Sequence, residues 1–376
     1  MKAPFSKTFR APLERLVGLA AFPGSWQKLP ALMVTDFQPL EKRMEVLAGW
    51  LDALHARDAF NGTVLIAQRG TIRFEKHCGF ADVDGAVPLS EHSSFSLASV
   101  SKPFTAMGIM LLARKRRLTL GDRMAQHIPQ LAGYGEITIR QLLHHTSGMP
   151  DYMELADLHW DPERVLTNGD LIDLLAKHRP PRYFAPGERF EYSNTGYVLL
   201  GEIISRVSGM PYAEFMAKEI FEPLGMNDSA AFNLASKRCP LRSRVFGIRK
   251  RFGWFGRKVL CDLNYLDGVF GDGGIYASAE DIARWDTELR KGTLIPNDVY
   301  AEAYVSGRLN NGEKTGYGFG WEIESPSVVW HWGEWQGFAS YIRRNLKNHE
   351  LLVVLSNLGP AAQVEAITAE LAPIFG

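Results

Sequence analysis

The sequence predicts an α+β fold in which strands from the two ends of the chain form one antiparallel sheet. Near the N-terminus, β-rich runs on either side of Arg69-Gly70 are typical of a hairpin, 63–68 followed by 71–75. Near the C-terminus, four further runs indicate antiparallel strands: 316–324, 328–332, 338–346 and 351–356. Residues 98–310 carry mainly helical spacing. The simplest arrangement is a sheet flanked by helices, with a mainly helical region inserted between its two groups of strands.

The individual helices follow from the spacing of apolar residues. A helix over 40–56 puts its leucines on one face. A terminal helix after the last strand carries on its apolar side Val364, Ile367, Leu371 and Ile374. Between them the spacing predicts helices at 118–128, 139–143, 170–178, 197–207 and 279–290. We expect three parts: an N-terminal extension over 1–36, a sheet domain from 37–97 and 311–376, and a mainly helical domain over 98–310.

The composition is that of a soluble globular protein, with 46% hydrophobic and 22% charged residues among 376. Lys+Arg and Asp+Glu both number 42, so no net field draws the chain toward nucleic acid or an acidic membrane. The cysteines form no C-x-x-C pair, which argues against a disulfide framework and a zinc site: Cys78, Cys239 and Cys261. We therefore expect no cofactor, no metal and no nucleic-acid partner.

Membrane insertion is not expected, because no apolar run reaches the ~18 residues that a spanning helix needs. The first 35 residues are basic, but their longest apolar run, 16–22, is interrupted by Gly18, and no convincing cleavage site follows it. An extension lying on the domain surface is favoured over a signal peptide. A cytoplasmic location is the favoured prediction, with a periplasmic or exported protein as the alternative. The oligomeric state stays open.

The first candidate for chemistry is Ser99-Val100-Ser101-Lys102, at the start of a long amphipathic helix whose buried face includes Phe104 and Met107. A spacing of three residues puts Ser99 and Lys102 on the same side of the helix. A desolvated lysine can take the proton of a serine hydroxyl and so make the serine a nucleophile. The alternative is an ordinary serine cap followed by a solvated lysine. Ser-x-x-Lys alone does not decide between them.

A second cluster is Glu191-Tyr192-Ser193-Asn194, after the turn signal Pro186-Gly187. Tyr192 and Asn194 lie on one side of an extended or looped backbone. A tyrosine oxygen near a lysine ammonium can hold a lowered pKa and move protons, and an asparagine amide can orient a substrate carbonyl and hold the lysine. The alternative is a core tyrosine beside a turn asparagine.

A third cluster is Trp330-His331-Trp332-Gly333-Glu334, at the end of a predicted strand. Gly333 allows a substrate backbone to approach closely, and an N–H group of this edge can join that of Ser99 in an oxyanion hole. His331 alone is more often a packed histidine than a functional one. For the basic segment 242–258, a solvated loop packed by its aromatic residues is favoured over a pocket for an anionic substrate.

Ser99-x-x-Lys102, Tyr192-x-Asn194 and His331-x-Gly333, in this order and spacing, resemble the motifs of the serine β-lactamase and penicillin-binding protein superfamily. The Tyr-x-Asn motif is similar to that of the class C and D-Ala-D-Ala carboxypeptidase branch, which includes β-lactamase-like esterases and D-aminopeptidases. Supporting stretches at 141–150 and 271–278 agree, and the resemblance covers roughly residues 40–376.

The resemblance implies a β-lactamase/transpeptidase-like fold, with Ser99, Lys102 and Tyr192 on the helical domain at its interface with the sheet. It also implies an acyl-enzyme on Ser99, with Lys102 and Tyr192 as a coupled pair that moves protons. The N–H groups of Ser99 and Glu334 would form the oxyanion hole. The catalytic positions would be Ser99, Lys102, Tyr192 and His331, and the substrate-binding positions Asn194, Gly333 and Glu334.

One departure from the family pattern bears on the substrate. His331-Trp332-Gly333 stands where many β-lactamases have Lys-Thr-Gly, and a histidine near pH 7 is mostly neutral. We therefore expect a serine hydrolase that cleaves an ester, amide or peptide bond of a small substrate, as an esterase or a D-amino-acid peptidase or carboxypeptidase. The alternatives are a true class C-like β-lactamase and a penicillin-binding protein with little turnover.

Overall fold

The computed structural model describes residue 32 and residues 40–236, 238–252, 255–359 and 362–371. Apart from residue 32, the expected extension over 1–36 lies outside the described residues, and so do Trp254 and Ile374. The division of the chain into an extension, a sheet domain and a helical domain stays a prediction.

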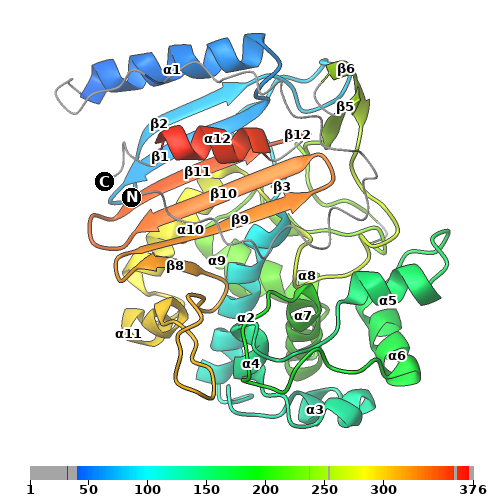
Figure 1. Cartoon of the computed structure of the whole chain (residues 1–376). Coiled ribbons are helices and arrows are strands. Elements are labelled where there is room, and N and C mark those ends of the chain that lie inside the picture. The colour runs from blue at the N-terminus through cyan, green and yellow to red at the C-terminus, as the bar shows by residue number, and fades with distance from the viewer. Residues whose placement is uncertain (1–31, 33–39, 237, 253–254, 360–361, 372–376) are drawn as a thin grey trace.

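One sheet of six strands joins the two ends of the chain in the order β2-β1-β11-β10-β9-β8 (Figure 1). Its strands are β1 (Gly62–Gln68), β2 (Thr71–Cys78), β8 (Glu322–Ser325), β9 (Val328–Trp335), β10 (Phe338–Asn345) and β11 (Glu350–Ser356). The ends meet in the antiparallel pair β1–β11, in register from Gly62 opposite Ser356 to Gln68 opposite Glu350. The predicted sheet of N- and C-terminal strands is confirmed.

Both faces of the sheet are buried, because its central strands are apolar on both sides. The helices that cover the faces are α1 (Leu40–Ala56), α12 (Ala362–Leu371), α2 (Lys102–Arg114) and α10 (Ala279–Lys291). Val64 and Ile66 of β1 pack into the core shared with α1 and α12. Leu65 and Ala67 point the other way and join the core that contains α2 and α10. Figure 1 shows α1 above the sheet and α2 below it.

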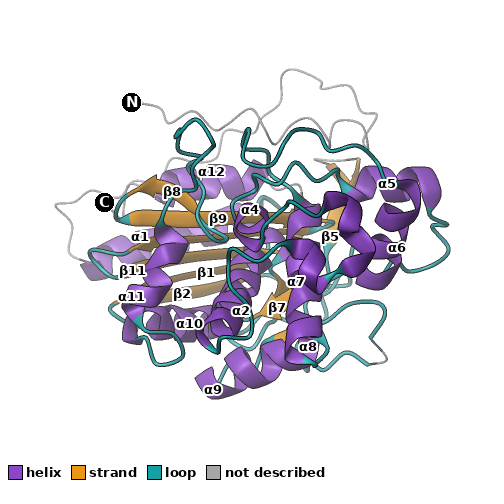
Figure 2. Ribbon diagram, turned by 90° about the horizontal axis from the view of Figure 1, so that it is seen from below, coloured by secondary structure: helices purple, strands orange, loops and turns teal. Residues whose placement is uncertain are grey.

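Helix α2 runs through the middle of the molecule, and Figure 2 shows it between the large sheet and α7. Every residue from Lys102 to Leu112 is buried. On one side Phe104 stacks on Trp285 of α10, with ring centroids 3.9 Å apart. On another side Gly108 leaves room for Ile204 of α7, because a Cβ at position 108 would lie 2.9 Å from Cδ1 of Ile204. The prediction of an amphipathic helix with one buried face is therefore wrong, because neighbouring elements surround α2.

The helices between the two groups of strands, apart from α2 and α10, are α3 (Met124–His127), α4 (Ile139–Leu143), α5 (Tyr152–His159), α6 (Asn168–His178), α7 (Asn194–Ser208), α8 (Tyr212–Met216), α9 (Glu222–Leu224) and α11 (Asn297–Tyr300). The predicted helices that correspond to α4, α6, α7 and α10 are confirmed. Among the described residues, no helix is both long and apolar enough to cross a membrane.

Two predicted elements are shorter than expected. The helix predicted at 118–128 is reduced to α3, because the Asp122 carboxylate accepts the N–H of Thr119 at 3.0 Å and closes a turn before it. The strand predicted at 316–324 begins only at Glu322. Gly316 and Gly320 each have a φ of 77°, which no regular strand contains, so the chain bends there instead.

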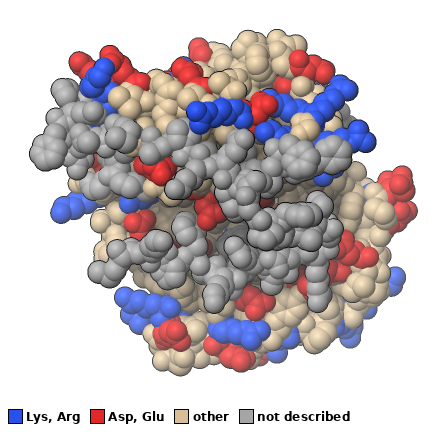
Figure 3. All heavy atoms as spheres, turned by 45° about the horizontal axis from the view of Figure 1, so that its top comes forward, with Lys and Arg blue, Asp and Glu red and all other residues tan. Residues whose placement is uncertain are grey.

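Two small sheets complete the fold, in the orders β3-β7-β4 and β12-β5-β6. Their strands are β3 (Phe95–Ser96), β7 (Ile275–Ala277), β4 (Ala230–Ala231), β12 (Leu358–Gly359), β5 (Ile248–Phe252) and β6 (Phe255–Leu260). The basic segment 242–258 is therefore wrongly predicted as a loop, because β5 and β6 pair as an antiparallel hairpin. Figure 3 shows Lys and Arg side chains gathered at the upper right, where Figure 1 places this hairpin.

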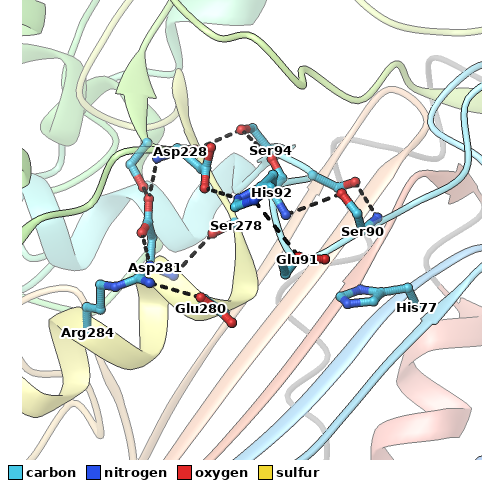
Figure 4. Close-up of polar contacts among 12 residues, drawn as sticks. His77, Ser90, Glu91, His92, Ser94, Asp228, Ser278, Glu280, Asp281 and Arg284 are labelled. Atoms are coloured by element: carbon cyan, nitrogen blue, oxygen red, sulfur yellow. Dashed lines mark hydrogen bonds and ion pairs between the residues drawn. The ribbon is translucent and has the colours of Figure 1, made fainter.

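A network of polar contacts fastens the segment before β3 to α10 (Figure 4). The carboxylate of Asp281 accepts hydrogen bonds from the Asp228 N–H and the Ser229 hydroxyl, each at 2.8 Å. The Asp228 carboxylate lies 2.9 Å from Nδ1 of His92, and the Asp228 carbonyl accepts from the Ser94 hydroxyl at 2.8 Å. Because Ser94 directly precedes β3, the network fixes the strand that leads into the candidate site.

Candidate active site

Ser99 lies in the turn that joins β3 to α2. The turn is a 3-10 helix over Ala98–Ser101, and the Val100 N–H donates to the Leu97 carbonyl at 3.0 Å. Ala98 has a φ of 47°, a conformation that a residue with a side chain rarely adopts. The apolar spacing of the sequence predicts Ser99 at the start of the helix itself. In the structure, Ser99 lies in the strained turn immediately before α2.

Lys102 is the first residue of α2 and is fully buried. Its Nζ lies 3.0 Å from Oγ of Ser99, 2.9 Å from Oδ1 of Asn194 and 3.0 Å from the carbonyl oxygen of Asp272. Burial lowers the pKa of Lys102 to about 7, although the charge of Asp272 opposes the shift. The structure thus brings Ser99, Lys102 and Asn194 together as predicted, and holds the lysine close to its point of titration at neutral pH.

Asp272 also belongs to the site, and no role for it was predicted from the sequence. Its carbonyl holds Lys102, and its carboxylate accepts a hydrogen bond from the Tyr152 hydroxyl at 3.3 Å. Burial raises the pKa of Asp272, and the nearby lysine charge lowers it. The preceding Gly271 has a φ of 114° and passes so close to Tyr197 that a Cβ would lie 2.2 Å from its carbonyl oxygen. The glycine-rich stretch around Asp272 was the available signal in the sequence.

Tyr192 lies in the loop before α7, with its ring centroid 4.8 Å from Nζ of Lys102. Burial raises the pKa of Tyr192 well above its ordinary value, and a hydrogen bond with Ser99 opposes the shift. The expectation of a lowered pKa is therefore wrong, because removal of the phenolate from water dominates. The buried ring of His145 packs against Tyr192, with centroids 4.3 Å apart, and its Nδ1 accepts the N–H of Ser193 at 3.0 Å.

His331 lies behind the site and is 2% exposed. Its Nδ1 is 2.7 Å from the carbonyl of Trp332, and its Nε2 is 2.9 Å from the Tyr317 hydroxyl. Because a carbonyl only accepts, Nδ1 carries the proton and Nε2 accepts the hydrogen of Tyr317. Burial lowers the pKa of His331 to about 3, so the ring is neutral near pH 7. A catalytic role for His331 stays a prediction.

Strand β9 passes directly over the Ser99 turn at Gly333. A Cβ on Gly333 would lie 2.4 Å from the carbonyl oxygen of Leu97, 2.4 Å from Oγ of Ser340 and 3.0 Å from the nitrogen of Ser99. This close approach requires glycine. Glu334 comes next along β9 and lines a cavity together with Ser99. An oxyanion hole formed by the N–H groups of these two residues stays a prediction.

The cavity at Ser99 is lined from β9, from α5 and from the loop between β6 and β7. Four residues of the site contribute to its wall: Ser99, Asn194, Asp272 and Glu334. Lys102, Tyr192 and His331 are not part of that wall and lie deeper. A molecule in the cavity would therefore contact Ser99 directly, whereas Lys102 lies behind the serine.

The family model described as Beta-lactamase matches residues 47–373. The chain belongs to the beta-lactamase family. Penicillin-binding protein 4* from Bacillus subtilis (strain 168) is 38% identical to it over 318 residues, which cover 81% of this chain and 70% of that protein. Further curated relatives, at 29% identity, are longer, and this chain spans 59% of their length.

Solved structures confirm the predicted β-lactamase/transpeptidase-like fold. The octameric penicillin-binding protein homologue from Pyrococcus abyssi superposes with a TM-score of 0.71 at 27% identity, over 88% of this chain and 77% of that chain. The D-amino acid amidase from Ochrobactrum anthropi SV3 superposes with a TM-score of 0.67 at 22% identity, over 87% of this chain and 97% of that chain. This second likeness is one of fold.

Proposed function

We propose that this member of the beta-lactamase family is a serine hydrolase that cleaves an ester or amide bond through an acyl-enzyme on Ser99. The observation that carries the proposal is the environment of Nζ of Lys102. Ser99 lies on one side of it, and two acceptors from Asn194 and Asp272 lie on the others. A serine hydroxyl becomes a useful nucleophile when a base lies within hydrogen-bond distance, and this lysine is buried enough to be that base.

Neutral Lys102 has the geometry of a general base. A neutral amine carries two hydrogens and one lone pair. The amide oxygen of Asn194 and the carbonyl of Asp272 accept the two hydrogens, so the lone pair is left for the hydroxyl of Ser99. Ser99 gives its proton to Nζ as its Oγ bonds to the carbonyl carbon of the substrate. A pKa of about 7 keeps much of Lys102 in the required neutral form.

Tyr192 supplies the second proton transfer. Because burial holds its pKa well above its ordinary value, Tyr192 keeps its proton in the resting site. As the tetrahedral intermediate collapses, Tyr192 gives that proton to the leaving group and is reprotonated from the Lys102 ammonium. Water then gives a proton to neutral Lys102 as its oxygen bonds to the acyl carbon. The Lys102 ammonium returns this proton to Oγ of Ser99 as the bond between Oγ and the acyl carbon breaks. The N–H groups of Ser99 and Glu334 are the proposed donors to the oxyanion at both stages.

A substrate without a carboxylate suits the site better than a penicillin. His331 holds both ring nitrogens against protein groups and carries no charge near pH 7, so it provides no fixed cation for a carboxylate. An ester or amide that has no carboxylate near His331 needs no such cation, so its binding is not weakened. A second candidate function, a penicillin-binding protein with little turnover, is supported by the 38% identity to Penicillin-binding protein 4*.

The test has two measurements. The first follows the mass of the intact protein over time after a penicillin is added, and the second follows the release of nitrophenol from p-nitrophenyl acetate. Wild type, Ser99→Ala and the control Ser327→Ala are compared, since Ser327 lies on the turn between β8 and β9. We expect turnover of the ester in wild type and in the control, and none above background in Ser99→Ala. Ester turnover that persists in Ser99→Ala would overturn the proposal. A lasting penicillin adduct with no ester turnover would support the second candidate.

A further inference from the structure

The wall of the cavity at Ser99 has one sign of charge. Its charged side chains in the described part of the chain are all carboxylates: Asp267, Asp272 and Glu334. Two cations lie close to the wall without being part of it. Lys102 is buried behind Ser99. Arg244 forms an ion pair with Asp262 and packs against the rings of Phe232 and Tyr276. Carboxylates in a partly desolvated cavity create a negative potential that favours a bound cation and opposes a bound anion.

The three carboxylates are not equally placed to meet a ligand. Asp272 is 9% exposed, accepts the Tyr152 hydroxyl and faces the charge of Lys102, so it already has partners. Glu334 is exposed. Asp267 lies between these extremes, half-buried in the same wall. It is the carboxylate that a substrate group can reach while being shielded from bulk water.

Asp267 is held rigidly and keeps capacity for a further donor. Its Oδ1 accepts the indole N–H of Trp335 at 2.6 Å, and its Oδ2 accepts the N–H of Asn264 at 2.6 Å. Each carboxylate oxygen has two lone pairs, so one position on each remains open. Burial, aided by the charges of Asp262 and Asp272, raises the pKa of Asp267 to about 7. A cation bound beside Asp267 would favour its ionised form and so lower its pKa again.

The rest of the wall suits an ammonium group carried on a small apolar body. Tyr152 and Trp335 contribute aromatic surface, and aromatic rings attract cations through their faces. Phe232 and Tyr276 also line the wall, but their rings already pack against the guanidinium of Arg244. The arginine-bearing hairpin does not reach this wall. Arg249 lines a separate hollow with Cys261 and Gln336, beyond Leu263, which both hollows share.

We propose that the acyl part of the substrate carries a free amino group, and that Asp267 binds this group as an ammonium ion. The inference rests on the proposed hydrolase function and deepens it by naming the substrate class: esters or amides of amino acids, and peptides with a free amino terminus. Ser99, Asn194 and Asp267 line the same cavity, so the amino group and the carbonyl to be attacked would lie within one enclosure.

The test compares two competitors of p-nitrophenyl acetate hydrolysis that differ in one charge, alaninamide and N-acetylalaninamide, in both enantiomers. Asp267→Asn removes the charge but keeps an oxygen that can accept the Trp335 indole N–H. Asp298→Asn, an exposed change on α11, is the matched control. The readout is the ratio of the two inhibition constants within each protein, which cancels any change in basal turnover.

We expect alaninamide to inhibit roughly tenfold or more better than its acetylated form in wild type and in Asp298→Asn, since a charge-assisted hydrogen bond is worth about that factor. The ratio should fall toward one in Asp267→Asn. A ratio of one in wild type, or one that survives in Asp267→Asn, would overturn the inference. Stronger inhibition by N-succinylalaninamide, an anion, would also overturn it and would point to Arg249 instead.

Failure of the proposed function is distinguishable from failure of this inference. If no ester is hydrolysed, the competitors are titrated calorimetrically into Ser99→Ala, which retains the cavity. Preferential binding of alaninamide would then support an amine-binding site in a protein without turnover. Equal or absent binding of both amides would reject the amine site independently of catalysis.

Discussion

The protonation of Lys102 should control the acylation rate. If neutral Lys102 is the base, kcat/KM for p-nitrophenyl acetate rises with pH through a midpoint of about 7, the pKa that burial gives the lysine. The neutral fraction is roughly a tenth at one pH unit below the midpoint and roughly nine-tenths at one unit above it. The rate should therefore fall about tenfold for each unit of acidification below about pH 6.

Two substitutions distinguish a role of Lys102 as a base from a role as a fixed positive charge. Lys102→Met removes both and should lower kcat/KM by roughly 10²- to 10⁴-fold. Lys102→Arg keeps the charge but cannot lose its proton, so it should be as inactive as Lys102→Met even at high pH. Lys115→Met, at an exposed position directly after α2, is the control. Thermal unfolding of each variant verifies that it is folded.

The lowered pKa of Lys102 also makes the free energy of unfolding depend on pH. Burial holds the pKa of Lys102 below its ordinary value of 10.5, so the unfolded chain binds more protons than the folded chain between about pH 7 and that value. Stability should therefore rise over this interval in wild type relative to Lys102→Met, and the gain should be lost as pH falls through about 7. A pH-independent acylation rate, or an active Lys102→Arg enzyme, would contradict the role of Lys102 as the base.

Three further changes test other parts of the site and fold. Gly333→Ala should lower activity more than about tenfold and destabilise the fold by about 1–3 kcal/mol, because the new Cβ would overlap the Leu97 carbonyl and the Ser340 hydroxyl; kinetics and denaturant unfolding measure both. Tyr192→Phe should lower kcat/KM by roughly 10²-fold or more, with a larger effect on amides than on activated esters, whose leaving groups need less protonation. Asp281→Ala should destabilise the fold by about 1–3 kcal/mol, because two donors lose their acceptor.

For each of these three substitutions, one outcome would contradict the prediction. Normal activity in Gly333→Ala would mean that β9 does not need its close approach to Ser99. Equal losses on amides and activated esters in Tyr192→Phe would argue against proton donation to the leaving group. An unchanged unfolding midpoint in Asp281→Ala would show that the network in Figure 4 is not needed to anchor β3.

Much of the architecture could be predicted from local patterns. The apolar spacing over 40–56 coincides with α1, and the strands of the N- and C-terminal groups pair in one sheet as expected. Ser99 and Lys102 could be paired because three residues in a helical chain separate neighbours in space. The predicted elements were wrong where the spacing of apolar residues was ambiguous. At 118–128 a turn closed by Asp122 replaced a helix, and at 242–258 two short strands were hidden among charged residues.

The chemistry of the site depends on contacts that no local pattern records. Asp272 reaches Lys102 from 170 residues away along the chain, and Asn194 reaches it from 92. The low pKa of Lys102 and the neutrality of His331 both follow from burial, which is a property of the packed molecule. The negative wall around Asp267 likewise forms only when distant segments meet. Residue types and spacing specify which groups are present, but their ionisation depends on the water that folding removes.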